Sequence, residues 1–157
     1  MNLLQYLSAL IIGGCIAFQA PVNNQLAVAF GNDVVLASLT SFFVGMVLLL
    51  VLALIGGNLP AALAIVPNQP LWKFSGGLLG VAYMFGAVYL VPRIGLASLL
   101  ALVIAGQILT SLTIDHFGLL GLMERRISLL KVAGAVLTLG GVVMMLFGDR
   151  LLAAWRA

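Results

Sequence analysis

The chain has 157 residues, of which 64% are hydrophobic and only 7% are charged, and its mean hydropathy is +1.26. Because soluble domains carry about a quarter charged residues, too few polar residues remain here to cover a soluble core, and we predict an integral membrane protein. The net charge of +3 comes from basic residues scattered near segment ends, which excludes the basic surface of a nucleic-acid-binding protein, and the single cysteine, Cys15, excludes an intrachain disulfide.

Five stretches are long and apolar enough to cross a bilayer, which requires about 20 residues per helix. They cover approximately residues 3–30, 34–55, 71–91, 96–117 and 128–147. Transmembrane strands would need only about 10 alternating residues each, so these lengths indicate helices. We therefore predict an all-α integral membrane protein in which residues 1–157 form a single five-helix transmembrane domain.

The first stretch contains Pro21 surrounded by four carboxamides: Gln19, Asn23, Asn24 and Gln25. Proline cannot donate to the carbonyl four residues earlier, so we predict that the first helix is kinked or broken at Pro21, which would act as a hinge. Helical geometry places Gln19 and Asn23 on one face and Asn24 about 100° further round.

These carboxamides require polar partners, because an unsatisfied amide costs about 1–3 kcal/mol in a protein interior. They can hydrogen-bond between helices around the proline, or they can line a binding site at an interrupted helix near the middle of the membrane. Both interpretations remain open, and different members of the cluster can follow different ones. In the second interpretation Gln19, Asn23 and Asn24 contact a substrate.

The connections follow from turn-forming residues. "GND" (31–33) predicts a tight turn, and the proline-containing segment 56–70 predicts the longest loop, in which "AALAIV" forms a short interfacial helix. "PRIG" (92–95) predicts a sharp turn, since Pro92 should end the third helix.

The third span contains Tyr83 near its middle and a pair of glycines, Gly76 and Gly80, four residues apart. Tyr83 can form the wall of a binding pocket or can fill the core with its hydroxyl hydrogen-bonded across helices. Glycines at this spacing allow another helix to approach closely, either within one chain or between two copies.

The fourth span has a polar row, Gln107, Ser111 and Asp115, that recurs every four residues and therefore lies on one helix face. Gln107 is near mid-membrane and is a candidate substrate contact opposite the first helix. Asp115 and His116 lie near the end of the span. They can form an interfacial pair, with Asp115 facing Lys73 or Arg125, or they can carry protons beside a cavity.

The distribution of basic residues gives only a weak preference for one orientation of the chain in the membrane. With the N-terminus inside, the inner side receives four of them, Lys73, Arg125, Arg126 and Lys131, and the outer side three, Arg93, Arg150 and Arg156. The chain can therefore have one weakly specified orientation, or it can insert both ways and pair as an antiparallel homodimer. Gly134 and Gly141 share a face of the last span and suit such packing, within one subunit or between two.

Catalytic motifs are absent from the sequence. It contains no G-x-S-x-G, no phosphate-binding glycine loop and no paired carboxylates at membrane depth, and no His/Cys/Asp cluster indicates a metal site. We predict that the protein is not an enzyme and uses no cofactor or metal. Any transport would be driven by a gradient, because a nucleotide site is missing.

Several segments resemble known transporters. "MERRISLLKVAGAVLTLGGVVMM" (123–145) resembles the end of a five-helix half of the drug/metabolite transporter superfamily. "GCIAFQAPVNNQLA" near the start and "VPRIGLASLLALVIAGQILTSLTIDHFGLLG" before the last helix are similar to the YdcZ-type family of five-helix bacterial proteins. The resemblance covers essentially the whole chain. It implies an EamA-related helical fold in the bacterial inner membrane and assembly as antiparallel pairs.

The resemblance also bears on the substrate. Small multidrug-resistance relatives place a proton-binding glutamate in their first helix, whereas this chain has Gln19 and Asn23 in the comparable region. Neutral amides suit a polar or zwitterionic metabolite better than a cationic drug. We therefore predict a secondary-active transporter of a small metabolite or drug that works by alternating access as an antiparallel homodimer surrounded by lipid. The alternatives are a dual-topology passive ion channel and a non-transporting membrane subunit.

Overall fold

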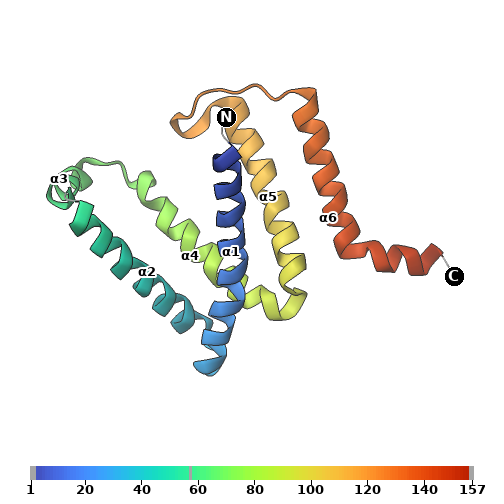
Figure 1. Cartoon of the computed structure of the whole chain (residues 1–157), viewed down its shortest axis with the longest axis horizontal. Helices are drawn as coiled ribbons and strands as arrows, with labels where there is room; N and C mark the ends of the chain where they lie inside the picture. Colours follow the sequence, from blue (N-terminus) through green and yellow to red (C-terminus); the bar gives the residue numbers. More distant parts are fainter. Residues whose placement is uncertain (1–2, 57, 156–157) are drawn as a thin grey trace. The chain divides into compact units, whose positions relative to one another are not determined.

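The structure is a computed structural model that describes residues 3–56 and 58–155, and within these ranges all regular elements are helical (Figure 1). Arg156, one of the outer-side charges counted above, lies outside the described residues. The elements in chain order are α1 (Leu3–Ala29), α2 (Val34–Gly56), α3 (Leu59–Ile65), η1 (Val66–Asn68), η2 (Leu71–Phe74), α4 (Ser75–Ile94), α5 (Leu96–Phe117), η3 (Leu119–Gly121) and α6 (Leu129–Trp155).

The predicted all-α membrane architecture is confirmed. Among the described residues, five segments have the length and apolar character to cross a membrane: Leu3–Ala29, Val34–Gly56, Leu71–Ile94, Leu96–Phe117 and Leu129–Leu152. The short helix expected in the longest loop is α3. The last helix is longer than the predicted span 128–147, since α6 continues through Trp155.

The predicted kink at Pro21 is not confirmed. Pro21 lies inside α1, which continues as one α-helix from Leu3 to Ala29 without the predicted break. A proline removes only one backbone donor, at a cost of about 3 kcal/mol, and lipid offers no substitute for the other hydrogen bonds that a break would expose. Burial of Ala20, Asn23 and Ala27 on either side of the proline also supports the continuous helix.

The predicted end of the third span is wrong by one helical turn. α4 passes through Pro92 and ends at Ile94, where Gly95 adopts a φ of +81° that favours glycine. A proline in the last turn affects one carbonyl only, that of Val88, so the helix can continue past it. The sharp turn therefore comes from Gly95 rather than from Pro92.

The turn between α1 and α2 is as tight as "GND" predicts. Gly31 and Asn32 both have a φ of +69°, which reverses the chain within a few residues. Asp33 then caps α2, because its Oδ1 accepts a hydrogen bond from the Leu36 N–H at 2.9 Å.

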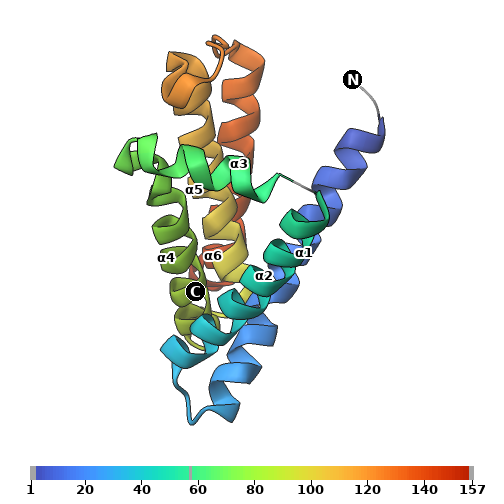
Figure 2. The same cartoon turned by 90° about the vertical axis from the view of Figure 1, so that its left-hand side faces the viewer.

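The chain divides into two compact units, Met1–Arg93 and Ile94–Ala157. In the first unit α1 and α2 pack together near their shared turn and diverge away from it (Figures 1 and 2). Its buried core joins three helices through Ala27 of α1, Ala37 of α2, and Met84 and Val88 of α4. Small residues at the contact let the helices approach closely.

The second unit is a pair of helices. α5 and α6 pack through Ala101, Ala105 and Val142, with Leu139 and Leu146 beside them. Gly118, with a φ of +57°, ends α5 and donates its N–H to the Ile114 carbonyl, which is a common way to terminate a helix.

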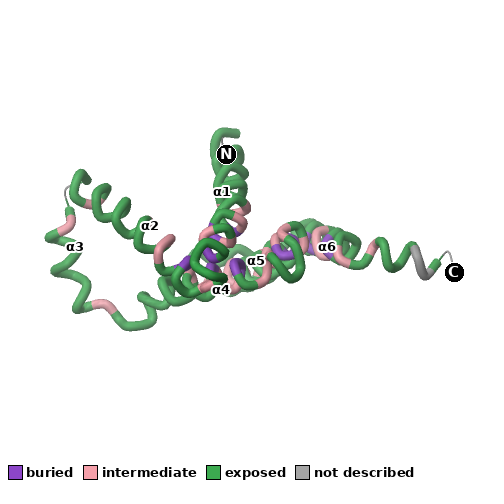
Figure 3. Tube along the Cα trace, turned by 90° about the horizontal axis from the view of Figure 1, so that it is seen from below, coloured by how far each residue is buried: buried purple, intermediate pink, exposed green. Residues whose placement is uncertain are grey.

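Most of the described chain is exposed (Figure 3), and many of the exposed side chains are large and apolar. In α2, for example, only Ala37 and Ser38 are buried. Large side chains such as Leu49, Ile55 and Leu79 are more than 60% exposed. Such a surface is stable against lipid or another apolar partner and not against water.

Candidate functional site

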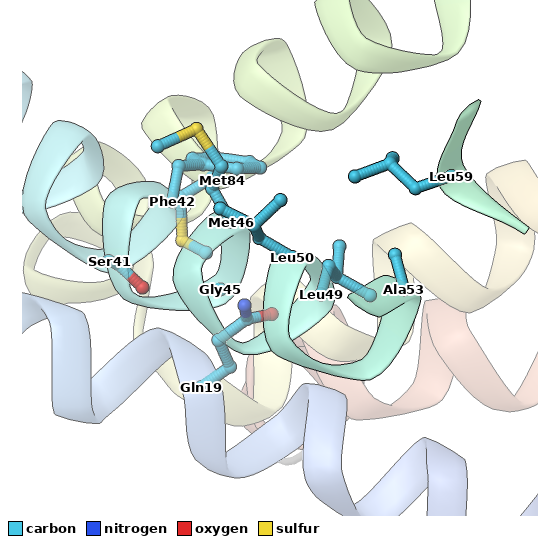
Figure 4. Close-up of a pocket in the computed structure, with 10 residues that line it drawn as sticks. All are labelled: Gln19, Ser41, Phe42, Gly45, Met46, Leu49, Leu50, Ala53, Leu59 and Met84. Carbon is cyan, nitrogen blue, oxygen red and sulfur yellow. The ribbon is translucent and has the colours of Figure 1, made fainter. Parts of the chain in front are cut away.

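A groove lies in the first unit where α1 and α2 diverge, and we call it the α1–α2 groove. Its volume is about 580 Å³. It is lined by Gln19 of α1, by Ser41, Phe42, Gly45, Met46, Leu49, Leu50 and Ala53 of α2, by Leu59 of α3 and by Met84 of α4 (Figure 4).

The chemistry of the α1–α2 groove is apolar with two polar positions. Gln19 projects from α1 toward α2, and Ser41 contributes a hydroxyl (Figure 4). The other walls are aliphatic, aromatic or thioether side chains. Small-molecule sites have this size and composition, with few polar groups in a mostly apolar wall. Gln19 is therefore the member of the predicted site that lies where a ligand can reach it.

Asn23 lies one helical turn from Gln19 but is 3% exposed. Its Nδ2 donates a hydrogen bond to the sulfur of Met84 in α4, at 2.9 Å. Met84 also lines the α1–α2 groove, so Asn23 is hydrogen-bonded to one wall residue of the groove that Gln19 lines. Asn23 is therefore part of the contact between α1 and α4, whereas Gln19 lines the groove.

Asn24 has a partner on α4 as well. Its Nδ2 donates to the backbone carbonyl of Val88 at 3.3 Å. In α4 that carbonyl would otherwise accept from residue 92, and Pro92 has no N–H. Asn24 of α1 therefore satisfies the carbonyl that Pro92 leaves without a helical donor in α4.

The remaining candidates of the first unit lie elsewhere. Pro21 is partly buried inside α1, and Gln25 is exposed. The Tyr83 hydroxyl is buried and has no hydrogen-bond partner among the described residues, and Tyr83 does not line the α1–α2 groove.

The polar row of the fourth span belongs to the second unit. Gln107 is exposed on α5. The Ser111 hydroxyl bonds within its own helix, to the Ile108 carbonyl at 3.0 Å. The row therefore follows the predicted helical spacing, with Asp115 partly buried near its end.

Asp115 and His116 accept hydrogen bonds from the loop that follows α5. The Asp115 backbone carbonyl accepts from the Arg125 N–H at 2.7 Å, and His116 Nδ1 accepts from the Ile127 N–H at 3.4 Å. The His116 ring also meets Phe117 edge-on, with centroids 4.8 Å apart. Among the described residues the ion pair is instead Glu124 with Arg126, at 3.3 Å. The Asp115 backbone carbonyl and the His116 ring thus hold this loop, and the Asp115 carboxylate takes no part in that contact.

The glycines proposed for packing have different surroundings. A Cβ added at Gly80 would meet the ring of Phe42 at 3.7 Å, so Gly80 lies at a contact within the first unit. A Cβ at Gly76, Gly134 or Gly141 would meet no heavy atom within 4 Å. These three glycines therefore face surface that is open to lipid or to another chain.

Sequence reasoning missed the partners on α4 and the wall of the groove on α2. Met84 and Val88 are buried in an apolar helix, and nothing in the sequence around Met84 marks it as a hydrogen-bond acceptor. Pro92 was the available signal for Val88, because a proline always leaves the carbonyl four residues earlier without its helical donor. Ser41 and Phe42 lie in a uniformly apolar span that carries no periodic signal.

A family model described as "Putative inner membrane exporter, YdcZ" matches residues 4–144. The comparisons with curated proteins and with solved structures found no match.

Proposed function

The chain belongs to the YdcZ family, and on this premise we propose that it is a secondary-active exporter of a small metabolite or drug in the bacterial inner membrane. It would work by alternating access as an antiparallel homodimer with an EamA-related arrangement of helices. The observation that carries the proposal is the α1–α2 groove, in which Gln19 stands in a mostly apolar wall between membrane-spanning helices.

The α1–α2 groove suits a ligand that is partly apolar and has a hydrogen-bonding group. Its volume of about 580 Å³ falls within the range of small-molecule sites. The Gln19 carboxamide both donates and accepts hydrogen bonds, so it recognises neutral polar groups without a charge. A weak, reversible site of this kind is what a carrier needs, since the substrate must also leave.

A second copy of the chain would complete the site. The groove is open on one side. Five helices are too few to enclose a substrate and also form the two gates that alternating access requires. Gly134 and Gly141 face open surface, which is compatible with close packing of another helix. The nearly balanced basic residues support insertion in both orientations, and the pair would then have the inverted symmetry on which many transporters depend.

The alternative with a specific observation behind it is a non-transporting membrane subunit. Asn23 and Asn24 are both hydrogen-bonded to α4, as expected for amides that only hold helices together. The groove at Gln19 favours the transporter, because a purely structural cluster would leave no such space.

Transport in proteoliposomes tests the function. The purified chain is reconstituted, a panel of labelled polar and zwitterionic metabolites is loaded, and efflux is followed with and without a proton or sodium gradient. A carrier gives saturable efflux that responds to a gradient. Unsaturable flux at very high turnover would indicate a channel, and absence of flux for every compound would favour the subunit.

Topology is tested separately. The exposed Cys15 is first replaced by serine, and single cysteines are then placed at each terminus in turn. Labelling of intact cells with a membrane-impermeant maleimide should reach a fraction of each terminus if the chain inserts both ways. Complete labelling of one terminus and none of the other would contradict the antiparallel homodimer.

A further inference from the structure

A second groove lies in the first unit, between the α1–α2 turn and the C-terminal half of α4, and we call it the turn groove. Its volume is about 780 Å³. The residues that give it its chemistry are Asn32 and Asp33 of the turn and Phe85, Tyr89 and Arg93 of α4. None of the residues proposed above as substrate contacts lines it except Asn24, whose amide donates to Val88.

The turn groove lies at a membrane surface. α1 and α2 are consecutive spans joined by a tight turn, so the turn emerges on one side of the bilayer. α4 crosses in the same direction as α1, and its C-terminal end therefore reaches the same side. Charged side chains in the groove are thus accessible to water and to soluble solutes.

Arg93 is held in a defined position in the turn groove. Its guanidinium stacks over the Tyr89 ring, 3.5 Å from the centroid, and donates a hydrogen bond to the Tyr89 carbonyl. The Tyr89 ring in turn lies parallel to that of Phe85, with centroids 6.4 Å apart. A guanidinium has five N–H donors, so this arrangement orients the group and leaves donors for an anionic ligand.

Asp33 supplies the opposite charge. One carboxylate oxygen, Oδ1, caps α2 through the Leu36 N–H, and the negative charge remains at the edge of the groove. Among the described residues the ion pair is that of Glu124 with Arg126, so Asp33 and Arg93 line one groove without pairing with each other. Two unpaired opposite charges on the walls of one pocket complement a molecule that carries both charges.

We propose that the turn groove binds a small zwitterion, with the anionic group on Arg93 and the ammonium group on Asp33. This inference goes beyond the proposed function, because the turn groove and the α1–α2 groove share no lining residue, and the site is tested by binding alone. Two sources share this chemistry, a soluble amino-acid-like metabolite and the headgroup of a zwitterionic phospholipid.

Matched probes test the charge requirement. Binding of labelled norvaline to the purified, full-length chain in phospholipid-free detergent is measured in the millimolar range, with pentanoate and butylamine as competitors that retain one charge each. Norvaline should bind about tenfold or more tightly than either competitor, because only it satisfies both side chains. Absence of norvaline binding, or equal affinity for pentanoate, would overturn the proposal.

Variants test the two side chains. Arg93→Gln should weaken norvaline binding by about tenfold or more, and Asp33→Asn, which keeps a capping oxygen for α2, should remove the preference for norvaline over pentanoate. The double variant Asp149→Asn with Arg150→Gln changes the same charges near the end of α6 and should bind as the unaltered chain does. Unchanged binding in both groove variants would contradict the assignment, and thermal unfolding identifies any variant that is misfolded.

Added phosphatidylethanolamine distinguishes the two sources. Displacement of norvaline assigns the groove to a lipid headgroup, whereas retained binding assigns it to a soluble zwitterion. Efflux of norvaline from proteoliposomes separates this proposal from the proposed function. Binding without efflux would keep the site and show that it does not serve the export of norvaline. Efflux that Arg93→Gln leaves unchanged would support the exporter and count against the site.

Discussion

The side-chain amide of Asn24 donates a hydrogen bond to the carbonyl of Val88, and that carbonyl is the one that Pro92 leaves without a helical donor. The two halves of this arrangement come from different helices, α1 and α4. A carbonyl without a donor is costly where lipid replaces water, so Asn24 compensates for the proline. One carboxamide of the first span thereby has a structural role that does not involve a ligand.

This compensation can be tested by a double-mutant cycle. Asn24→Ala should lower the free energy of unfolding by about 1–3 kcal/mol, because the Val88 carbonyl loses its donor. Pro92→Ala restores a backbone N–H to the same carbonyl, so it should stabilise the Asn24→Ala chain more than the unaltered chain. Thermal unfolding in detergent measures all four variants. Equal effects of Pro92→Ala in both backgrounds would show that the two residues are not coupled.

The hydrogen bond from Asn23 to Met84 predicts a second coupling. Met84→Leu conserves volume but removes the acceptor, which leaves the buried Asn23 amide unsatisfied, and should cost about 1–3 kcal/mol of stability. The same change in an Asn23→Leu background should cost less, because no donor remains. Chemical or thermal unfolding of the four chains gives the coupling energy. A value near zero would contradict the structural role of the hydrogen bond and make Asn23 a candidate ligand contact again.

The two glutamines of the first span should differ in transport. Gln19 lines the α1–α2 groove and Gln25 does not, although both are exposed. Gln19→Leu should reduce the efflux rate at limiting substrate by about tenfold, which corresponds to the loss of roughly one good hydrogen bond to the substrate. Gln25→Leu is the matched control and should leave the rate unchanged. Equal effects of the two changes would argue against the groove.

The loop after α5 should depend on His116. His116→Phe keeps a ring against Phe117 but removes the Nδ1 acceptor of the Ile127 N–H, at an expected cost of about 0.5–1.5 kcal/mol. Trypsin should then cleave faster after the exposed Arg125 and Arg126. Asp115→Asn leaves the backbone bond to Arg125 intact and should not change the cleavage rate. Slower gradient-driven transport in that control would instead support a role of Asp115 in proton coupling.

The prolines are where the sequence predictions and the structure differ: the helix end predicted at Pro92 is wrong, and the kink predicted at Pro21 is not confirmed. Local rules treat a proline as the end or the kink of a helix, yet α1 continues past Pro21 and α4 past Pro92. In each case the cost of one missing hydrogen bond is smaller than the cost of exposing several backbone groups to lipid. Gly95, rather than Pro92, marks the end of α4, since its positive φ changes the direction of the chain.

Sequence alone determined the number of spans, their approximate limits and the tight turn after α1. These features depend on local quantities, namely the apolar length needed to cross a bilayer and the turn chemistry of neighbouring residues. It also placed Gln19 and Asn23 on one face of α1, because that follows from helical geometry.

Only the tertiary structure decided what each carboxamide meets. Gln19 lies on a groove, whereas Asn23 and Asn24 bond to residues 61 and 64 positions later in the chain. The tertiary structure likewise places Asp33 and Arg93 on the walls of one groove without pairing their charges. Helical periodicity states which residues share a face, but which helix packs against that face depends on contacts between distant segments, and those contacts have no local signature in an apolar chain.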